Sequence, residues 1–275
     1  MAFGAAQYET VTAARDGAVG ILTLNRPTRL NALSRQMLEE IEAACDAAEA
    51  DEAVRALVVT GAGKAFSAGF DLQDQAAATP QGAAEWAPVL RRDFDGVMRF
   101  WRLSKPTVAA VEGPALAGGC EMAIACDVTV AGADALFGEP EVKFGAGIVV
   151  MLLPWLVGPK KAKEIAFLGL DQISAEEARA IGLINRVVPT GRALEEATAL
   201  ARRIAVVDPM VMRRTKQQIN ESLTIAGFDE ALERSLAIDL ELEGEGSDDK
   251  RAFLEELRRG GLRGALAWRD RRFGG

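Results

Sequence analysis

Two glutamates, Glu121 and Glu141, are the residues best suited to chemistry, and each follows a glycine-bearing turn. Because the chain contains no histidine, a general acid or base near neutral pH is expected to be a carboxyl group with a shifted pKa. Glu121 lies in the apolar segment 118–126, and Glu141 follows Pro140 directly. Burial raises a carboxyl pKa, and neighbouring carboxyls push their pKa values apart. Such a pair could supply an acid and a base together.

Two glycine turns, Gly69-Phe70 and Gly118-Gly119, each follow a predicted apolar strand. Main-chain N–H groups from two such turns could hold a developing oxyanion. The second turn opens a predicted helix, whose N-terminal dipole would add to this field. The alternative is that these glycines serve only tight turns.

Three familiar motifs are incomplete in the segment 58–69. A phosphate loop would need a glycine at Val58 and a serine or threonine at Ala65. The dinucleotide fingerprint fails because Phe66 occupies the third glycine position. Ser67 resembles the serine of a nucleophile elbow, but the first glycine and a histidine partner are missing.

The composition narrows the class of protein. A chain of 275 residues with 49% hydrophobic content can build one large α/β domain or two small ones. The net charge of -8 and the pI near 4.9 argue against nucleic-acid and anionic membrane partners. Cys45, Cys120 and Cys126 form no CxxC pair, which favours a reducing compartment over a disulfide frame or a zinc site. With neither a signal-peptide pattern nor a long apolar span, we expect a cytoplasmic protein without a metal ion.

The elements that must position these residues are predicted from periodicity. We expect a hairpin over 9–24, a helix over 34–50 capped by Ser34, and buried strands over 55–60, 107–111 and 128–131. Residues 73–85 are predicted as a mobile surface loop before an amphipathic helix, and 117–124 as a short helix. This alternation favours parallel β/α layers.

Beyond Gly158 the pattern changes to helices. They are predicted over 160–168, from 174 onward with a capping box, and over 193–206, 211–223, 229–240 and much of 248–272. The stretch 144–159 is predicted to be a buried core segment. No linker precedes the helices, so the carboxyl third is expected to be a helical lid or subunit interface of the same domain.

Several segments in chain order resemble the crotonase, or enoyl-CoA hydratase/isomerase, superfamily. The resemblance spans about residues 8–260, and its motifs lie in 26–34, 64–72, 105–121, 137–141 and 174–185. It implies a spiral of ββα turns over residues 1–200 and a helical lid or oligomerisation region over 201–275. Such proteins usually assemble as homotrimers or homohexamers.

The resemblance also implies an acyl-CoA substrate and no cofactor beyond the substrate's own coenzyme A. Hydratases of the superfamily have glutamate at both catalytic positions, which here are Glu121 and Glu141. The oxyanion hole that holds the thioester oxygen corresponds to the N–H groups of Phe70 and Gly118. The residues expected along the coenzyme A groove are Arg29, Leu30, Ala32, Ala68, Gly69, Asp71 and Leu72. The implied reaction is syn addition of water to a 2-enoyl-CoA.

Other readings remain at this point. One alternative is an isomerase, since isomerases of the superfamily generally need a carboxylate only at the second position, here Glu141. Other members of the superfamily hydrolyse, decarboxylate or cleave acyl-CoAs. A non-catalytic acyl-CoA-binding protein is a further alternative. The segment 142–155 is shorter and more apolar than the corresponding stretch of hydratases, so the acyl pocket is expected to be reshaped and the acyl chain stays open. Glu112 and Glu139 are predicted to be structural, although either could perturb the titration of the pair.

Overall fold

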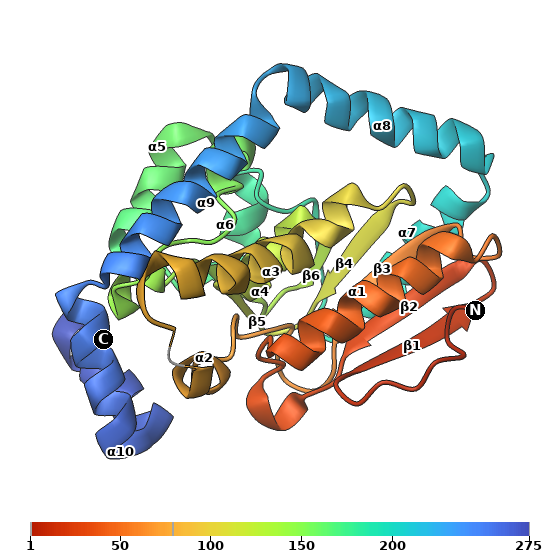
Figure 1. Ribbon diagram of the computed structural model, residues 1–275. Coiled ribbons are helices and arrows are strands. Elements are labelled where there is room, and N and C mark those ends of the chain that lie inside the picture. The colour runs from red at the N-terminus through yellow and green to blue at the C-terminus, as the bar shows by residue number, and fades with distance from the viewer. Residues whose placement is uncertain (1, 79, 275) are drawn as a thin grey trace.

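A six-stranded mixed sheet forms the centre of the computed structural model, which describes residues 2–78 and 80–274 (Figure 1). The strand order is β1-β2-β3-β4-β6-β9, and every neighbouring pair except the β1–β2 hairpin is parallel. The strands are β1 (Val11–Asp16), β2 (Val19–Leu24), β3 (Ala56–Gly61), β4 (Thr107–Val111), β6 (Val128–Gly132) and β9 (Arg186–Val188). The predicted hairpin and parallel β/α arrangement are confirmed.

A second, three-stranded sheet is built from strands that alternate along the chain with those of the main sheet. It has the order β5-β7-β8, with β5–β7 parallel and β7–β8 antiparallel. Its strands are β5 (Pro114–Leu116), β7 (Leu136–Gly138) and β8 (Ile173–Ser174). Because β5 follows β4 and β7 follows β6, the chain twice supplies a strand to the main sheet and then one to the small sheet. This alternation is the ββα spiral.

Helices cover both faces of the main sheet and continue beyond it (Figure 1). Ser34 begins the first helix by accepting the N–H of Met37 on its hydroxyl, as predicted. The helices are α1 (Arg35–Ala50), α2 (Leu72–Ala78), α3 (Gly82–Arg102), α4 (Gly118–Ala125), α5 (Leu153–Leu168), α6 (Ala175–Ala180), α7 (Ala193–Ala205), α8 (Pro209–Ile225), α9 (Phe228–Glu245) and α10 (Asp248–Phe273). Short 3-10 turns, η1 (Pro27–Arg29) and η2 (Glu141–Phe144), complete the set.

The two faces of the main sheet have separate cores. On one face, alanines of α7 at 193, 197 and 201 pack on Val58, Val108 and Val130, so the helix lies close to the strands. The larger core on the other face joins the sheet to α1, α3 and α4. Strands covered on both faces are expected to be mainly apolar, and the fully buried strand β4 is apolar except for Thr107.

The region from 73 to 85 differs from the predicted loop. Residues Leu72–Ala78 form α2, and α3 already begins at Gly82. The Asp71 carboxylate accepts the N–H groups of Gln73 and Asp74, and the alanines and glutamines that follow favour a helix. Leu72 and Ala76 also pack against the apolar cluster of α10. The sequence had indicated a loop because Pro80 and Gly82, which disfavour a continuous helix, lie within this stretch.

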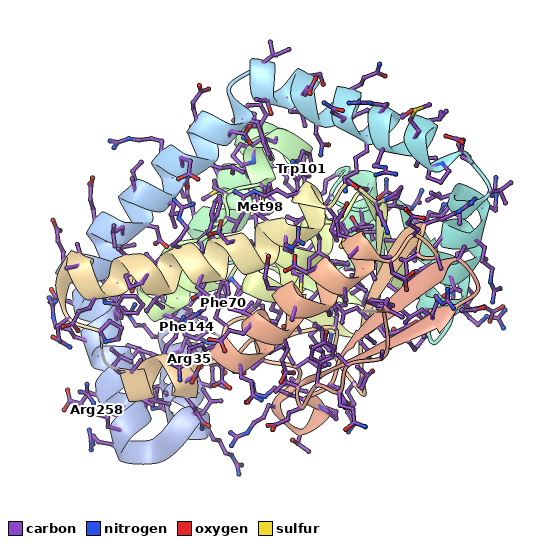
Figure 2. All side chains as sticks on the ribbon, turned by 45° about the vertical axis from the view of Figure 1, so that its right-hand side comes forward. Arg35, Phe70, Met98, Trp101, Phe144 and Arg258 are labelled. Carbon is purple, nitrogen blue, oxygen red and sulfur yellow. The ribbon has the colours of Figure 1, made fainter. Side chains whose placement is uncertain are left out.

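The carboxyl-terminal helices pack on the core rather than standing alone. Trp101 of α3, labelled in Figure 2, lies against Phe228 of α9 with ring centroids 4.9 Å apart. α10 covers α2 and η2, and Phe253 meets Phe144 edge to face at 5.0 Å. The predicted core segment 144–159 is buried mainly over 148–153, whereas Pro154, Leu156 and Pro159 are exposed and the rest is half-buried. The domain boundary at residue 200 stays a prediction.

Within the described ranges, none of the helices combines the length and apolar character that crossing a membrane requires.

Candidate active site

Glu121 reaches the interior of the protein from α4, a helix buried on all sides. The helix begins at Gly118 after Ala117, which adopts a positive φ of 52°. Glu121 lies in its first turn, where the helix dipole favours a negative charge. Its Oε1 accepts the main-chain N–H of Val150 at 3.1 Å, and its Oε2 has no partner among the described residues. The side chain is 0% exposed, so the predicted burial is confirmed.

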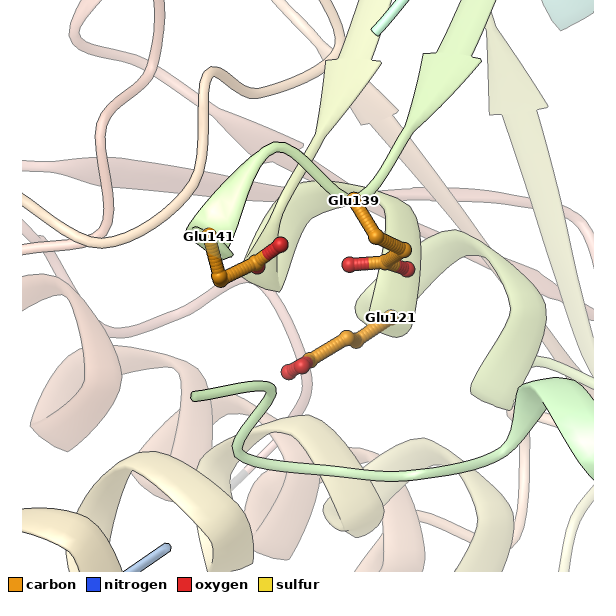
Figure 3. A group of neighbouring side chains, drawn as sticks. All are labelled: Glu121, Glu139 and Glu141. Carbon is orange, nitrogen blue, oxygen red and sulfur yellow. The ribbon is translucent and has the colours of Figure 1, made fainter. Parts of the chain in front are cut away.

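Glu139 and Glu141 approach Glu121 from the segment after β7 (Figure 3). The main-chain N–H of Glu139 donates to the Leu170 carbonyl at 2.8 Å, and Pro140 then turns the chain into η2, which begins at Glu141. One carboxylate oxygen from each of the three glutamates lies within 4.8 Å of the others. The structure therefore joins Glu121 and Glu141 as predicted, and it adds Glu139 as a third member.

Burial raises the pKa of each carboxyl in this cluster. Burial is the largest cause for Glu121, followed by the charge of Glu141, whereas the Val150 N–H opposes both and favours the ionised form of Glu121. The pKa of Glu141 is raised to about 8, and that of Glu139 is raised well above its usual value, again mainly by burial. The cluster therefore keeps protons at neutral pH, so it can offer an acid beside a base.

The two predicted oxyanion turns lie against each other. A Cβ on Gly69, whose φ is +91°, would lie 2.6 Å from Ala117 Cβ and 3.3 Å from the amide nitrogen of Gly118. A Cβ on Gly118 would lie 2.5 Å from the Phe70 ring. Neither the Phe70 N–H nor the Gly118 N–H donates a hydrogen bond within the described part of the chain. Both amides are thus free to donate to a bound ligand.

Ser67 supports one of these turns and has no catalytic environment. Its hydroxyl donates to the Asn31 carbonyl at 2.9 Å and accepts the Gly69 N–H at 3.2 Å. The side chain is 0% exposed and, without a histidine in the chain, has no base of the usual kind. The exclusion of Ser67 as a nucleophile agrees with this geometry.

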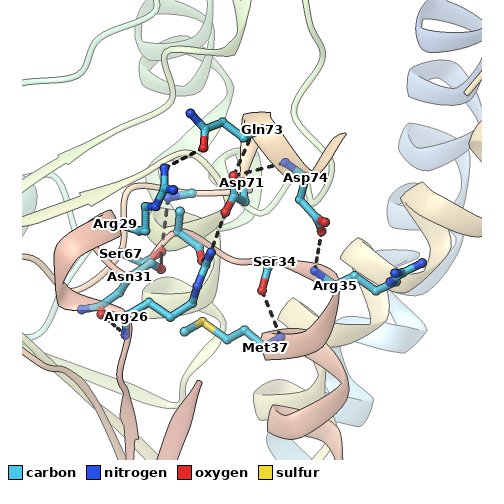
Figure 4. A network of polar contacts seen from close by, with 12 residues as sticks. Arg26, Arg29, Asn31, Ser34, Arg35, Met37, Ser67, Asp71, Gln73 and Asp74 are labelled. Atoms are coloured by element: carbon cyan, nitrogen blue, oxygen red, sulfur yellow. Dashed lines mark hydrogen bonds and ion pairs between the residues drawn. The ribbon is translucent and has the colours of Figure 1, made fainter. Parts of the chain in front are cut away.

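The residues predicted for the coenzyme A groove come from two segments that the structure brings together (Figure 4). The Ala68 N–H donates to the Leu30 carbonyl at 2.9 Å, and Arg29 donates to the Gln73 side chain at 2.6 Å. Asp71 pairs with Arg26 at 2.9 Å, and that Arg26 side chain also donates to the Ala32 carbonyl. Gly69 and Leu72 flank Asp71 on the same segment.

Glu112 and Glu139, both predicted to be structural, have different environments. The Glu112 carboxylate accepts the N–H of Ala193 at 2.8 Å, which fixes the start of α7 and agrees with the prediction. Glu139 is 1% exposed and has no partner on either oxygen among the described residues. The structural role of Glu139 stays a prediction, and its place within 4.8 Å of Glu121 and Glu141 fits the stated alternative that it perturbs the titration of the pair. Its position two residues before Glu141, across a proline, was the available signal.

The comparison with known proteins decides the family. The family model described as enoyl-CoA hydratase/isomerase matches residues 14–255. The chain belongs to this family. A crystal structure of an enoyl-CoA hydratase/isomerase from Xanthobacter autotrophicus Py2 has a TM-score of 0.95 and 56% identity, covering 97% of this chain and 99% of that one.

Relatives of the enoyl-CoA hydratase/isomerase family also match this chain in sequence. A Thermus thermophilus protein, provisionally named an enoyl-CoA hydratase, is 46% identical over 206 residues, or 73% of this chain and 80% of the relative. The crotonyl-CoA hydratase of Syntrophomonas wolfei is 34% identical over 261 residues, covering 90% of this chain and 96% of the relative. The predicted family, α/β fold and enzyme class are thus confirmed.

Proposed function

We propose that this chain is an enoyl-CoA hydratase that adds water across the 2,3 double bond of an enoyl-CoA. The observation that carries the proposal is the buried approach of Glu121 to Glu141, since hydration needs a base for water and an acid for Cα. Hydratase names among relatives that cover nearly all of this chain support the same reaction over double-bond isomerisation.

The roles of the two glutamates follow from their surroundings. Burial raises the pKa of Glu121 too, but its place in the first turn of α4 and the Val150 N–H both favour the ionised form, and in this proposal Glu121 deprotonates water. Glu141, whose pKa is raised to about 8, keeps its proton at neutral pH and supplies it to Cα. The two carboxyls thus add the elements of water to neighbouring carbons.

The N–H groups of Phe70 and Gly118 hold the thioester oxygen in this proposal. Negative charge grows on that oxygen as water attacks Cβ, and one such donor contributes about 3–4 kcal/mol to stabilising the transition state. Neither amide donates a hydrogen bond to any of the described residues, and their turns are in contact. The adjoining segments with Arg29, Leu30, Ala32, Ala68 and Asp71 would then receive coenzyme A, along with Gly69 and Leu72. The substrate's coenzyme A is the only cofactor that the reaction needs.

Hydration of crotonyl-CoA by Glu121→Gln and Glu141→Gln tests these roles. Each exchange keeps the side-chain volume, and each is expected to lower kcat by about 10²–10⁴. Glu112→Gln is the matched control, because Glu112 serves the start of α7. Undiminished hydration by Glu121→Gln would end the proposal. Binding of acyl-CoA without turnover, across crotonyl, longer-chain, aromatic and cyclic enoyl-CoAs, would instead identify a silent binder.

A homotrimer or homohexamer is also part of the proposal. Apolar side chains remain exposed on and near α8, where Val206 is 82% and Ile225 87% exposed, and Phe167 at the end of α5 is 74% exposed. α8 itself exposes Met210, Val211, Ile219 and Ile225, and a group of exposed apolar side chains on one helix is typical of an interface. Light scattering after size exclusion should give three or six times the mass of one chain, whereas a monomer would contradict the assembly.

A further inference from the structure

Glu139 is a buried carboxyl that has no role in the proposed reaction of Glu121 and Glu141. It is 1% exposed, and neither of its oxygens has a partner among the described residues. One of its oxygens nevertheless lies within 4.8 Å of oxygens of both Glu121 and Glu141 (Figure 3). A buried polar group without a partner is costly, so a structural role alone does not account for this position.

The surroundings of Glu139 favour its neutral form. No Lys or Arg in the described ranges forms an ion pair with it. The neighbouring Cys120 thiol is also buried, and its pKa is raised to about 12, so this thiol stays neutral and cannot replace a carboxyl in proton transfer. Glu139 is therefore held as a carboxylic acid, which has one O–H donor and one free acceptor oxygen.

After each turnover, the proposed hydration leaves Glu121 and Glu141 in protonation states opposite to those in which they began. Water loses a proton to Glu121 as its oxygen bonds to Cβ, and Glu141 gives its proton to Cα as the alkene becomes a single bond. The product then leaves with Glu121 protonated and Glu141 ionised. One proton has to pass from Glu121 to Glu141 before the next substrate can react.

We propose that Glu139 carries this proton. Its acceptor oxygen takes the proton from Glu121 while its own O–H proton passes to Glu141, so Glu139 ends as neutral as it began. The step needs no metal or redox partner and restores both catalytic glutamates. It rests on the proposed hydratase function, and it makes Glu139 a relay residue that does not touch the substrate.

Rapid mixing of Glu139→Gln with excess crotonyl-CoA tests the relay. Glutamine keeps the volume but has no acidic proton, so the first hydration should proceed at nearly the wild-type rate and the steady rate should fall by about tenfold to a hundredfold. This gives a burst of one product per active site that wild type lacks. A steady rate equal to wild type, or a first turnover slowed as much as the steady rate, would overturn the relay.

Two further variants keep the test decisive. Asp239→Asn removes another buried carboxyl that has no hydrogen-bond partner among the described residues and lies outside the cluster of three, and it should show no burst. Glu139→Asp retains an acidic proton on a shorter side chain and serves if Glu139→Gln does not fold. Glu139→Asp should give a burst, with a smaller loss of the steady hydration rate than Glu139→Gln. A steady rate equal to that of the wild type, without a burst, would count against the relay. Absence of hydration in the wild type would instead reject the proposed function itself.

Discussion

The main-chain N–H of Val150 donates a hydrogen bond to Oε1 of Glu121 across 29 residues of sequence. The same loop is attached to the carboxyl-terminal helices, because the Ser247 hydroxyl before α10 donates to the Gly145 carbonyl at 2.8 Å. The charge state of Glu121 therefore depends on a loop whose position the last helices help to fix. This link connects the helical region to the chemistry.

Val150→Pro removes the N–H that favours ionised Glu121. A hydrogen bond to a charged group contributes about 1.5–3 kcal/mol, so the acidic limb of the pH–rate profile should move up by about one to two pH units. Val150→Ala retains the N–H and is the control, since it loses only side-chain packing. An acidic limb that stays in place in Val150→Pro would show that this donor does not influence the base.

The alkaline limb of the same profile should reflect Glu141. Because burial raises its pKa to about 8 and the reaction needs its proton, kcat/KM for crotonyl-CoA should fall as pH rises through about 8. Measurement from pH 5 to 10 in buffers of constant ionic strength checks this. A flat profile from pH 7 to 9.5 would mean that Glu141 does not act as the acid.

Stability should fall as pH rises from about 4.5 to 8. Burial raises the pKa of Asp93 and Asp239 to about 6 and that of Glu141 to about 8, so the folded state binds more protons than the unfolded state over this range. Each such group lowers the free energy of unfolding by about 1.4 kcal/mol per pH unit between its unfolded and folded pKa. Urea unfolding should show a shallower fall between pH 6 and 8 in Glu141→Gln, and equal slopes would contradict the assignment.

Gly118→Ala tests the contact between the two oxyanion turns. The added methyl would meet the Phe70 ring at 2.5 Å and move one turn against the other. Displacing an oxyanion donor is expected to lower kcat by about 10²–10³. Gly264→Ala places the same methyl in open space on α10 and should leave kcat unchanged. Normal kcat in Gly118→Ala, with the fold intact by circular dichroism, would argue against an oxyanion hole here.

Asp71→Ala tests the proposed coenzyme A groove. The change removes the ion pair with Arg26 and the cap of α2, so KM for crotonyl-CoA should rise several-fold while kcat changes less. Glu233→Ala, which breaks the exposed pair with Arg91, is the control and should alter neither constant. A fall in kcat at constant KM would place Asp71 in the chemistry instead of in binding.

Local patterns in the sequence were sufficient for most of the elements. The hairpin, α1 with its Ser34 cap, and the apolar strands β3, β4 and β6 follow from periodicity and capping within a few neighbouring residues. α2 was missed because its start depends on the Asp71 cap and its stability on contacts with α10, which lies far along the chain. Local composition cannot report such distant packing.

The sequence by itself determined which residues could act. Without histidine, and with Glu121 and Glu141 in apolar settings, it pointed to carboxyl chemistry and to turns at Gly69 and Gly118. The tertiary structure alone decided that Glu139 joins the pair and that the Val150 N–H reaches Glu121. Distances between side chains depend on how β7, η2 and α4 pack. The pKa of a buried carboxyl depends on the burial that this packing creates, and a local sequence pattern does not show how deeply a side chain is buried.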